Sequence, residues 1–413
     1  MSIKFSIRFL VFNVGFIALL FIMCLNSISS LDFINLFFKY LDEMLAAIML
    51  LYVMLHYKSA IKLNRKVVFA WIGILIIGFL SSLVFRYQKL FPVVFDALIS
   101  CSKFIIAYFF IKIYIHRNPR YYTAYIVTVC KVIVIVLSLF ALHDLIFAPF
   151  FKKNEFRYIT YSLQLMFPYP TYLAYAGATL LIIFGYLNRN KKYLGYMILS
   201  TFICAVSLRT KSLGFIMLYW LFYITTFVFK RKKAWFTIIG SAIAAAIVGY
   251  DQIVITFFTA NRFSPRSILI KDSVALMGRH FPLGTGFGTF GTVSARDFYS
   301  VLYIDLGYPG MTGMSPTDTQ FLSDSFWPSI FAQFGFFGLL LFIYLVILLF
   351  KQSIRMLKKN KETGFAMIMI LSYMLVTSLA EAAFFNPASF LMFILYGVFE
   401  EESKLKCQLY MTK

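Results

Sequence analysis

Long runs of apolar residues alternate with short polar segments along almost the whole chain. A helix needs about 20 apolar residues to cross about 30 Å of hydrocarbon, and most of the runs approach that length. The pattern therefore predicts an all-α polytopic membrane protein with about twelve transmembrane helices. The predicted helices lie near 7–28, 42–57, 66–85, 91–115, 122–148, 170–187, 193–208, 212–229, 234–257, 327–350, 364–381 and 386–399.

The composition strengthens this prediction. Of the 413 residues, 61% are apolar and only 14% are charged. Soluble domains have about 45–50% apolar and about 25% charged residues, so a soluble enzyme, a disordered chain and a coiled coil are excluded. The five cysteines form no CxxC pair, and they indicate neither a disulfide framework nor a zinc site.

The net charge of +22 has a simple explanation in a membrane protein. Lys and Arg gather in cytoplasmic loops, so the basic connections mark the inner side, and no nucleic-acid partner is expected. With the amino terminus inside, these connections are 58–66, 116–120, 188–192, 230–233, 351–362 and the tail after 399. Lys4 and Arg8 precede the first run, which we interpret as an uncleaved helix. Both termini are then cytoplasmic.

Two outer segments are longer than connectors need to be. One is 149–170, which contains Lys152, Lys153 and Arg157. The other is a large loop, 259–326, that divides the chain into helices one to nine (1–258) and helices ten to twelve with the tail (327–413). It carries cations on the side that disfavours them, which an anionic ligand at the outer face would explain. These cations are Arg262, Arg266, Lys271, Arg279 and Arg296.

Arg209 and Lys211 lie between two closely spaced apolar runs, at the outer end on this topology. Cations near membrane depth usually face a cavity or a partner. One interpretation is that they extend to the interface around an apolar stem. The other is a phosphate clamp, because the guanidinium group matches phosphate oxygens.

A glycine-rich stretch follows Arg279 and His280 in the large loop: residues 281–291 read FPLGTGFGTFG. Glycines allow close approach of the backbone and expose N–H donors to an anion. Neither a dinucleotide fingerprint nor a nucleotide P-loop is present. A tight re-entrant turn and an anion-binding segment both remain open.

Asp324 precedes the tenth predicted helix. A carboxylate there could accept a proton from a hydroxyl, and it could also cap the helix. Elsewhere, Lys131 could pair with Asp144 or Glu381 inside the membrane. No ligand spacing supports a metal site.

Two motifs carry a family resemblance. Residues 281–290 (FPLGTGFGTF) resemble the P-L-G-x-G-x-G-x-F segment of bacterial O-antigen polymerases and ligases, and 323–327 running into 332–340 resembles the start of their next helix. The topology is similar too, with a Ser-Leu-Arg motif between helices seven and eight. The resemblance implies a GT-C-like glycosyltransferase in the bacterial plasma (inner) membrane. Its donor would be an undecaprenyl-diphosphate-linked glycan, with no metal and no cofactor.

Within that superfamily the Wzy-type polymerase is favoured, since ligases typically have a His–Asn pair where this chain has Asp324 and Ser325. The expected product is O-antigen, capsule or a related polysaccharide. Expected partners are membrane lipids, a chain-length regulator protein and the repeat-unit flippase. A ligase that transfers glycan to lipid A core or protein, and a transporter or flippase of lipid-linked oligosaccharide, are the alternatives.

The implied chemistry assigns roles to residues. Cations must stabilise the departing diphosphate, and Arg209 with Arg279 is the predicted pair, with Lys211 and Arg266 as second choices. Asp324 or His280 would deprotonate the acceptor hydroxyl. The backbone at Gly284 and Gly286 would contact the diphosphate. Tyr299, Tyr303, Tyr308 and Trp327 would stack on sugars or form an interfacial belt.

Overall fold

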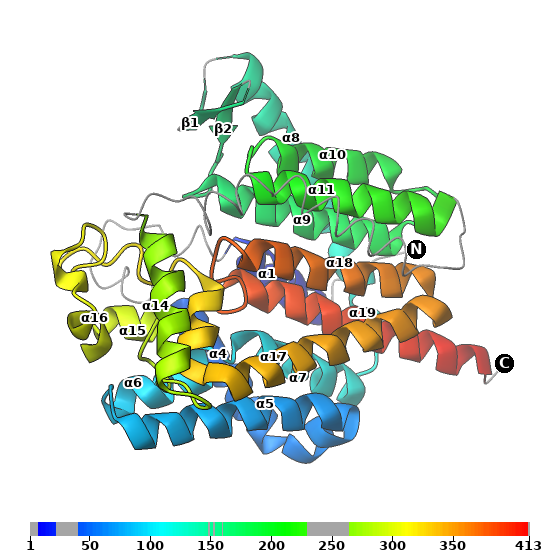
Figure 1. Ribbon diagram of the computed structural model, residues 1–413. Coiled ribbons are helices and arrows are strands. Elements are labelled where there is room, and N and C mark those ends of the chain that lie inside the picture. Colours follow the sequence, from blue (N-terminus) through cyan, green and yellow to red (C-terminus); the bar gives the residue numbers. More distant parts are fainter. Residues whose placement is uncertain are drawn as a thin grey trace.

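The structure, a computed structural model, consists of helices and one small hairpin of strands (Figure 1). It describes residues 7–21, 40–147, 149–151, 153–158, 160–228 and 264–411. Helices occupy part or all of every predicted transmembrane range except 234–257, which lies outside the described residues. The helices of the bundle are α1 (Ile7–Leu20), α4 (Leu41–Leu55), α5 (Tyr57–Phe85), α6 (Leu90–Phe95), α7 (Lys103–Arg117), α8 (Thr123–Ile146), α9 (Pro170–Leu187), α10 (Leu194–Ala205), α11 (Thr210–Tyr223), α17 (Phe326–Lys359), α18 (Lys361–Ser378) and α19 (Ala388–Met411).

Five of the described helices are long and apolar enough to cross a membrane: α5, α8, α9, α17 and α11 with its π-helical extension η2 (Ile224–Val228). A sixth crossing results if α6 and the π-helix η1 (Asp96–Ser100) are joined to α7, from which they are bent by 49°. The chain is therefore compatible with a helical membrane protein. The described helices account for five or six crossings. Among the remaining predicted ones, α4 and α10, with 15 and 12 residues, are shorter than a full crossing needs, and 234–257 lies outside the described residues.

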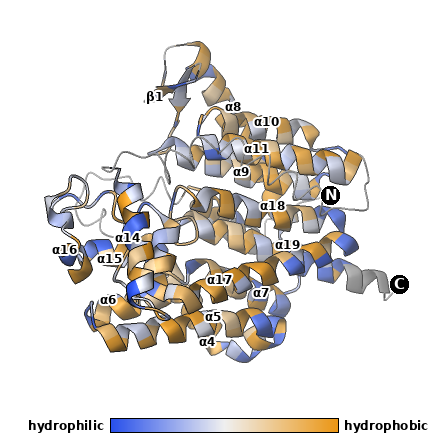
Figure 2. Ribbon diagram, viewed as in Figure 1, coloured by the Kyte–Doolittle hydropathy of each residue, from blue (hydrophilic) through white to orange (hydrophobic). Residues whose placement is uncertain are grey.

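Small residues place α9 at the centre of the bundle. Its sequence holds several alanines and glycines, and the backbone of α10 lies so close that a Cβ at Gly177 would come within 2.7 Å of the Cys204 amide nitrogen. By contrast, α5 and α8 expose apolar side chains such as Leu83 and Leu139. Hydrophobic residues cover much of the bundle helices in Figure 2, as expected of surfaces that face lipid.

The described part of the large loop, 264–325, is folded. It contains α14 (Pro265–Arg279), α15 (Val293–Asp297), α16 (Val301–Asp305) and the 3-10 turn η4 (Tyr308–Gly310). A small core of its own includes Leu276, Phe290 and Tyr303, and α14 packs along α17. This unit lies at one end of the bundle, and the C-terminal end of α19 lies at the other (Figure 1).

A break in α17 explains the glycine segment, defined here as residues 284–291. Gly335 has φ +60° and ψ −156°, so the helix cannot continue its hydrogen-bond ladder there. The amides of Thr285 and Gly286 donate to the carbonyls of Ala332 and Gln333, at 2.7 Å and 3.0 Å. The segment thus satisfies backbone groups that the break leaves unpaired, a requirement inside a membrane.

The segment 149–170 contains an antiparallel hairpin of β1 (Lys153–Arg157) and β2 (Thr160–Leu163). It projects beside the end of α8, at the end of the bundle that carries α14 (Figure 1). The amide of Leu163 donates to the carbonyl of Val206 at 3.0 Å, and the buried hydroxyl of Ser162 donates to the carbonyl of Ser207 at 2.6 Å. The hairpin is therefore attached to the turn between α10 and α11.

Candidate functional site

Charged side chains from five separate segments meet at the hairpin end of the bundle. Four are cations and three are carboxylates, and the interactions below join them. We call this group the cationic site; its members are Arg157, Arg209, Lys211, Arg266, Glu155, Asp324 and Glu381. Three of the four cations have a carboxylate partner, so one positive charge is left over.

Arg209 is the cation without a partner. It makes no ion pair with a described residue, and its Nε atom is buried without a hydrogen-bond partner among the described groups. Burial lowers its pKa, and so does the charge of Arg157, whereas Glu155 and Glu381 raise it. The group remains a cation, since an arginine side chain is not deprotonated in proteins. An anion at this position would offset the cost of burying that charge.

Local backbone geometry holds Arg209 in place. Leu208 before it has a left-handed φ of +48°, and Arg209 itself is extended as the N-cap of α11. The hairpin fixes this turn through Val206 and Ser207, and the hydroxyl groups of Tyr158 and Thr210 are 3.0 Å apart. The N-terminal end of α11 adds a partial positive charge at the same point.

The other cations are each paired. Arg157 donates to Glu155 from Nη2 at 2.8 Å, and this hydrogen bond lowers the pKa of Glu155. Lys211 donates to Glu381, which follows α18, and both side chains are largely buried. The sequence left open whether Glu381 pairs with Lys131, and the structure pairs Glu381 with Lys211 instead. Lys131 pairs with neither Asp144 nor Glu381, since its ammonium group lies 5.3 Å from the centre of the Tyr193 ring.

Asp324 completes the site on the α17 side. Its Oδ2 atom is 3.6 Å from Nη2 of Arg266, and each of the two side chains is about two-fifths exposed, at 39% and 40%. Burial raises the pKa of Asp324; the charge of Arg266 opposes this shift and that of Glu381 adds to it. A carboxylate with a raised pKa is a stronger base than a free aspartate, and here it lies beside cations. No side-chain capping hydrogen bond is made by Ser325, the residue that caps α17.

The predicted pairing of Arg209 with Arg279 is wrong. Arg279 is exposed at the last position of α14, whereas Arg266 is at its second position. Thirteen residues of helix separate the two by about 20 Å, at 1.5 Å per residue. Arg266 acts on the pKa of Arg209, so it takes the place that the sequence assigned to Arg279.

His280 is also displaced from the site. Its Nε2 atom lies 3.0 Å from the hydroxyl of Tyr87, its Nδ1 atom lies 2.9 Å from the carbonyl of Leu276, and its ring packs edge-on against Phe85. Both nitrogens are engaged where α14 meets the end of α5. The histidine therefore has a structural environment, far from Asp324.

The glycine segment does not expose its amides to a ligand. Gly284 and Gly286 are buried, and a Cβ at either position would come within 2.4 Å of the atoms of another segment. The segment is thus packed against other parts of the protein as a tight turn, and the amides of Gly286 and Gly288 donate to Gln333 and, at 2.8 Å, to Asp96.

The predicted aromatic contacts separate into two kinds. Tyr299 donates to the carbonyl of Met314 at 2.9 Å and packs on Tyr303, inside the small core of the loop. Tyr308 donates to Asp272 in the same core. Trp327 is different, because its buried Nε1–H has no partner among the described groups and it follows Asp324 by three residues.

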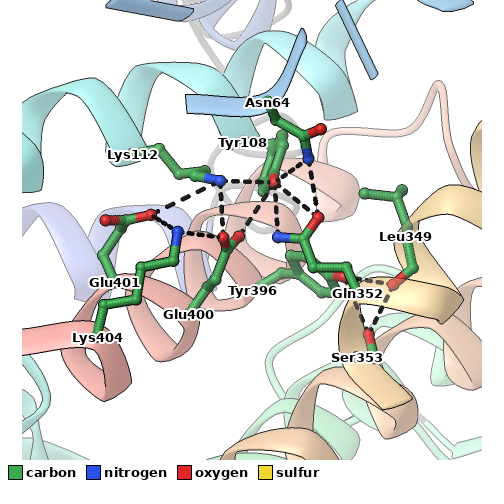
Figure 3. A network of polar contacts seen from close by, with 10 residues as sticks. All are labelled: Asn64, Tyr108, Lys112, Leu349, Gln352, Ser353, Tyr396, Glu400, Glu401 and Lys404. Atoms are coloured by element: carbon green, nitrogen blue, oxygen red, sulfur yellow. Dashed lines mark hydrogen bonds and ion pairs between the residues drawn. The ribbon is translucent and has the colours of Figure 1, made fainter. Parts of the chain in front are cut away.

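A second polar group lies near the opposite end of the bundle (Figure 3). It joins α5, α7, α17 and α19, and the sequence analysis did not identify it. Lys112 donates to Glu400 at 2.8 Å and to the hydroxyl of Tyr108 at 2.9 Å, and Lys404 donates to Glu400 at 2.6 Å. We call it the distal network; its members are Asn64, Tyr108, Lys112, Gln352, Ser353, Tyr396, Glu400, Glu401 and Lys404.

Comparison of the sequence with protein-family models and with curated proteins finds no match. The fold and the site therefore define a class only: a mainly helical chain, compatible with a membrane protein, that carries a cationic site at one end. Within the described residues there is no group of three or more His, Cys, Asp or Glu side chains that could hold a metal ion.

Proposed function

We propose that this protein is a membrane glycosyltransferase that polymerises undecaprenyl-diphosphate-linked oligosaccharide repeat units into O-antigen or a related surface polysaccharide. The observation that carries the proposal is Arg209, a partly buried cation without an ion-pair partner among the described residues, in a group that also holds Lys211, Arg266 and the carboxylate Asp324. A departing lipid diphosphate needs cations of this kind, and an acceptor hydroxyl needs a base beside them.

In the proposed reaction the acceptor hydroxyl oxygen forms a bond to the anomeric carbon of the donor sugar. The bond from that carbon to the diphosphate oxygen breaks, and its electron pair stays on the diphosphate. Asp324 accepts the hydroxyl proton. Arg209, with Lys211 and Arg266, stabilises the negative charge that develops on the leaving group, an effect that is usually the largest single contribution to catalysis.

The pairing of Arg266 with Asp324 supports this division of roles. Burial raises the pKa of the Asp324 carboxyl group, and the charge of the Arg266 guanidinium group opposes that shift by favouring the ionised form. The same guanidinium group could bind a diphosphate oxygen, which would free the carboxylate to accept its proton. Binding of the donor and activation of the base would then be linked through one side chain.

The proposed topology has twelve crossings in a GT-C-like arrangement, with both termini in the cytoplasm and the cationic site at the outer face of the bacterial plasma membrane. The basic connections 116–120 and 188–192 support it, since they link helix ends opposite to those that carry the site. The folded unit 264–325 then covers the site from outside.

A transporter of lipid-linked oligosaccharide is the second candidate. The observation in its favour is a pair of broken helices, α17 at Gly335 and the α6–η1–α7 segment, which resemble the discontinuous helices of secondary transporters. The two candidates differ in whether a glycosidic bond is made.

Reconstitution in vesicles with lipid-linked repeat units tests the proposal. We expect a ladder of polymers on the lipid carrier, the same ladder in the presence of a chelator, and no ladder with the variant Arg209→Ala. Transfer of single repeat units across the bilayer without bond formation would instead identify a transporter. Transfer of glycan to lipid A core would identify a ligase.

A further inference from the structure

The carboxyl group of Asp96 is fully buried where η1 meets the glycine segment. Its Oδ2 atom accepts a hydrogen bond from the amide of Gly288 at 2.8 Å and from the thiol of Cys101 at 3.6 Å. The side chains of Thr292 and Gln333 lie beside it. All of these groups are uncharged, and no described cation forms an ion pair with Asp96.

The other titratable groups nearby do not supply a cation either. Tyr303, from α16, faces Asp96, and its hydroxyl oxygen accepts a hydrogen bond from the amide of Gly291 at 2.8 Å. Lys103, at the start of α7, is held by Asp42 and Glu43 on α4. An ionised carboxylate at Asp96 would therefore be a buried charge without compensation, which is strongly unfavourable.

Two acceptor atoms at this position lack a donor. The Oδ1 atom of Asp96 and the Oε1 atom of Gln333 are both buried without a hydrogen-bond partner among the described groups. Rotating the amide of Gln333 does not remove the problem. Its Nε2 atom donates to the carbonyl of Phe290 at 2.7 Å, and a flip would place an oxygen against that oxygen. A single proton between the two acceptors satisfies both.

We infer that Asp96 is a neutral carboxylic acid in the folded protein, and that its O–H group donates a hydrogen bond to Oε1 of Gln333. The proton joins three separate segments. Asp96 belongs to the broken helix η1, Gly288 to the glycine segment and Gln333 to the half of α17 before its break at Gly335.

This arrangement makes Asp96 a positioning residue for the cationic site. The glycine segment begins five residues after the last residue of α14, the helix that carries Arg266, and Gln333 follows Asp324 by nine residues near the start of α17. Holding the two segments together fixes how α14 packs along α17, and hence the 3.6 Å contact between Arg266 and Asp324. Only this positioning role rests on the proposed function; the protonation of Asp96 does not.

Two variants test the inference. Asparagine has the shape of the neutral acid and can donate to Gln333 while it accepts from Gly288, so Asp96→Asn should melt within about 2 °C of the wild type. Asp96→Ala removes both hydrogen bonds and should melt at least about 4 °C lower. Polymerising activity should be retained by the first variant and reduced several-fold in the second. A variant Asp96→Asn that is as unstable as Asp96→Ala would overturn the inference.

Infrared spectroscopy of the wild-type protein at neutral pH gives an independent readout. The difference spectrum between wild type and Asp96→Asn should contain the C=O stretch of a protonated carboxyl group. A carboxylate band in its place would refute the neutral acid. Melting in sodium and in potassium salts against choline salt should be unchanged. Stabilisation of the wild type by one of these ions, absent in Asp96→Asn, would show that a metal cation occupies the position instead of a proton.

If the protonated band is present but activity is unaffected in both variants, Asp96 is neutral without being a positioning residue. If the band is present and the ladder is absent even from the wild-type protein, the proposed function fails while the inference on protonation stands.

Discussion

The cationic site and the distal network contain the same kinds of side chain and differ in how completely those side chains are satisfied. In the distal network, the Lys112 and Glu400 side chains are 0% and 3% exposed, and each lysine contacts both glutamates. In the cationic site, Arg266 and Asp324 are 40% and 39% exposed, and Arg209 has a buried N–H group without a hydrogen-bond partner in the part of the chain that the structure describes. A closed, neutral group is suited to holding helices together. An open group with excess positive charge is suited to binding an anion.

The burial of each group decides how much the removal of one charge changes the free energy of unfolding. A buried pair leaves an uncompensated charge when one member is removed, whereas a partly exposed pair is screened by water. Substitutions in the distal network should therefore act on stability, and substitutions in the cationic site should act on activity. Four predictions test this contrast, from the largest expected effect to the smallest.

Lys112→Met should destabilise the protein by about 3–5 kcal/mol, because it leaves Glu400 and Glu401 with one cation between them in a buried position. Thermal unfolding in detergent measures the loss. The double variant Lys112→Met/Glu400→Gln should regain much of it, since one of the uncompensated charges is then gone. A single variant as stable as the wild type would remove the structural role from the distal network.

Arg209→Ala should lower the rate of polymerisation by about 10²–10³-fold, the usual effect of deleting one group that stabilises a developing negative charge. The measurement is ladder formation from lipid-linked repeat units in vesicles. Arg209→Lys should retain part of the activity because it keeps the charge but not the paired N–H groups. The melting temperature should change little in both variants; a large drop would place Arg209 with the structural charges.

Arg266→Ala should move the acid limb of the pH–rate profile to higher pH. The reaction needs the ionised form of Asp324, so activity is lost as the pH falls through the pKa of this carboxyl group. Burial holds that pKa above its ordinary value and Arg266 lowers it, so removing Arg266 lets it rise further. A profile that is unchanged, or shifted to lower pH, would exclude Asp324 as the base.

Arg279→Ala should change activity by less than about twofold, since a surface substitution away from a site is usually nearly neutral. Arg279 is on the same helix as Arg266 and carries the same charge, which makes it a matched control for the two variants above. A loss of activity as large as that of Arg209→Ala would show that Arg279, at the C-terminal end of α14, belongs to the functional site.

Part of the site follows from the sequence, because charge in an apolar chain is conspicuous. The sequence predicts Arg266 as a loop cation on the side that the positive-inside rule disfavours, Arg209 and Lys211 as cations near membrane depth, and Asp324 as a carboxylate before a predicted helix. Their meeting at one place depends on tertiary structure. The choice of Arg279 failed because the sequence does not reveal that 265–279 is one straight helix with Arg266 and Arg279 at opposite ends.

Other features had no signal that sequence reasoning could use. Arg157 joins the site only because a short hairpin lies against the α10–α11 turn, and neither the hairpin nor its docking is visible in 149–170. The glycines suggested exposed amides, but the break in α17 at Gly335 leaves carbonyl groups unpaired, and amides of the glycine segment donate hydrogen bonds to them. Lys112 was hidden in an apolar run, and Glu400 follows the last predicted helix, so their pairing across 288 positions could not be anticipated.

Because the hairpin is hydrogen-bonded to Val206 and Ser207, a movement of the hairpin would also move Arg209. Phe156 and Tyr158 are exposed on this hairpin, 61% and 62%, within reach of a molecule that never enters the site. A binder raised against the tip of the hairpin would displace the α10–α11 turn, which positions the guanidinium group of Arg209. On the topology proposed above the hairpin faces the outside of the cell, so such a binder would inhibit without mimicking any sugar or lipid.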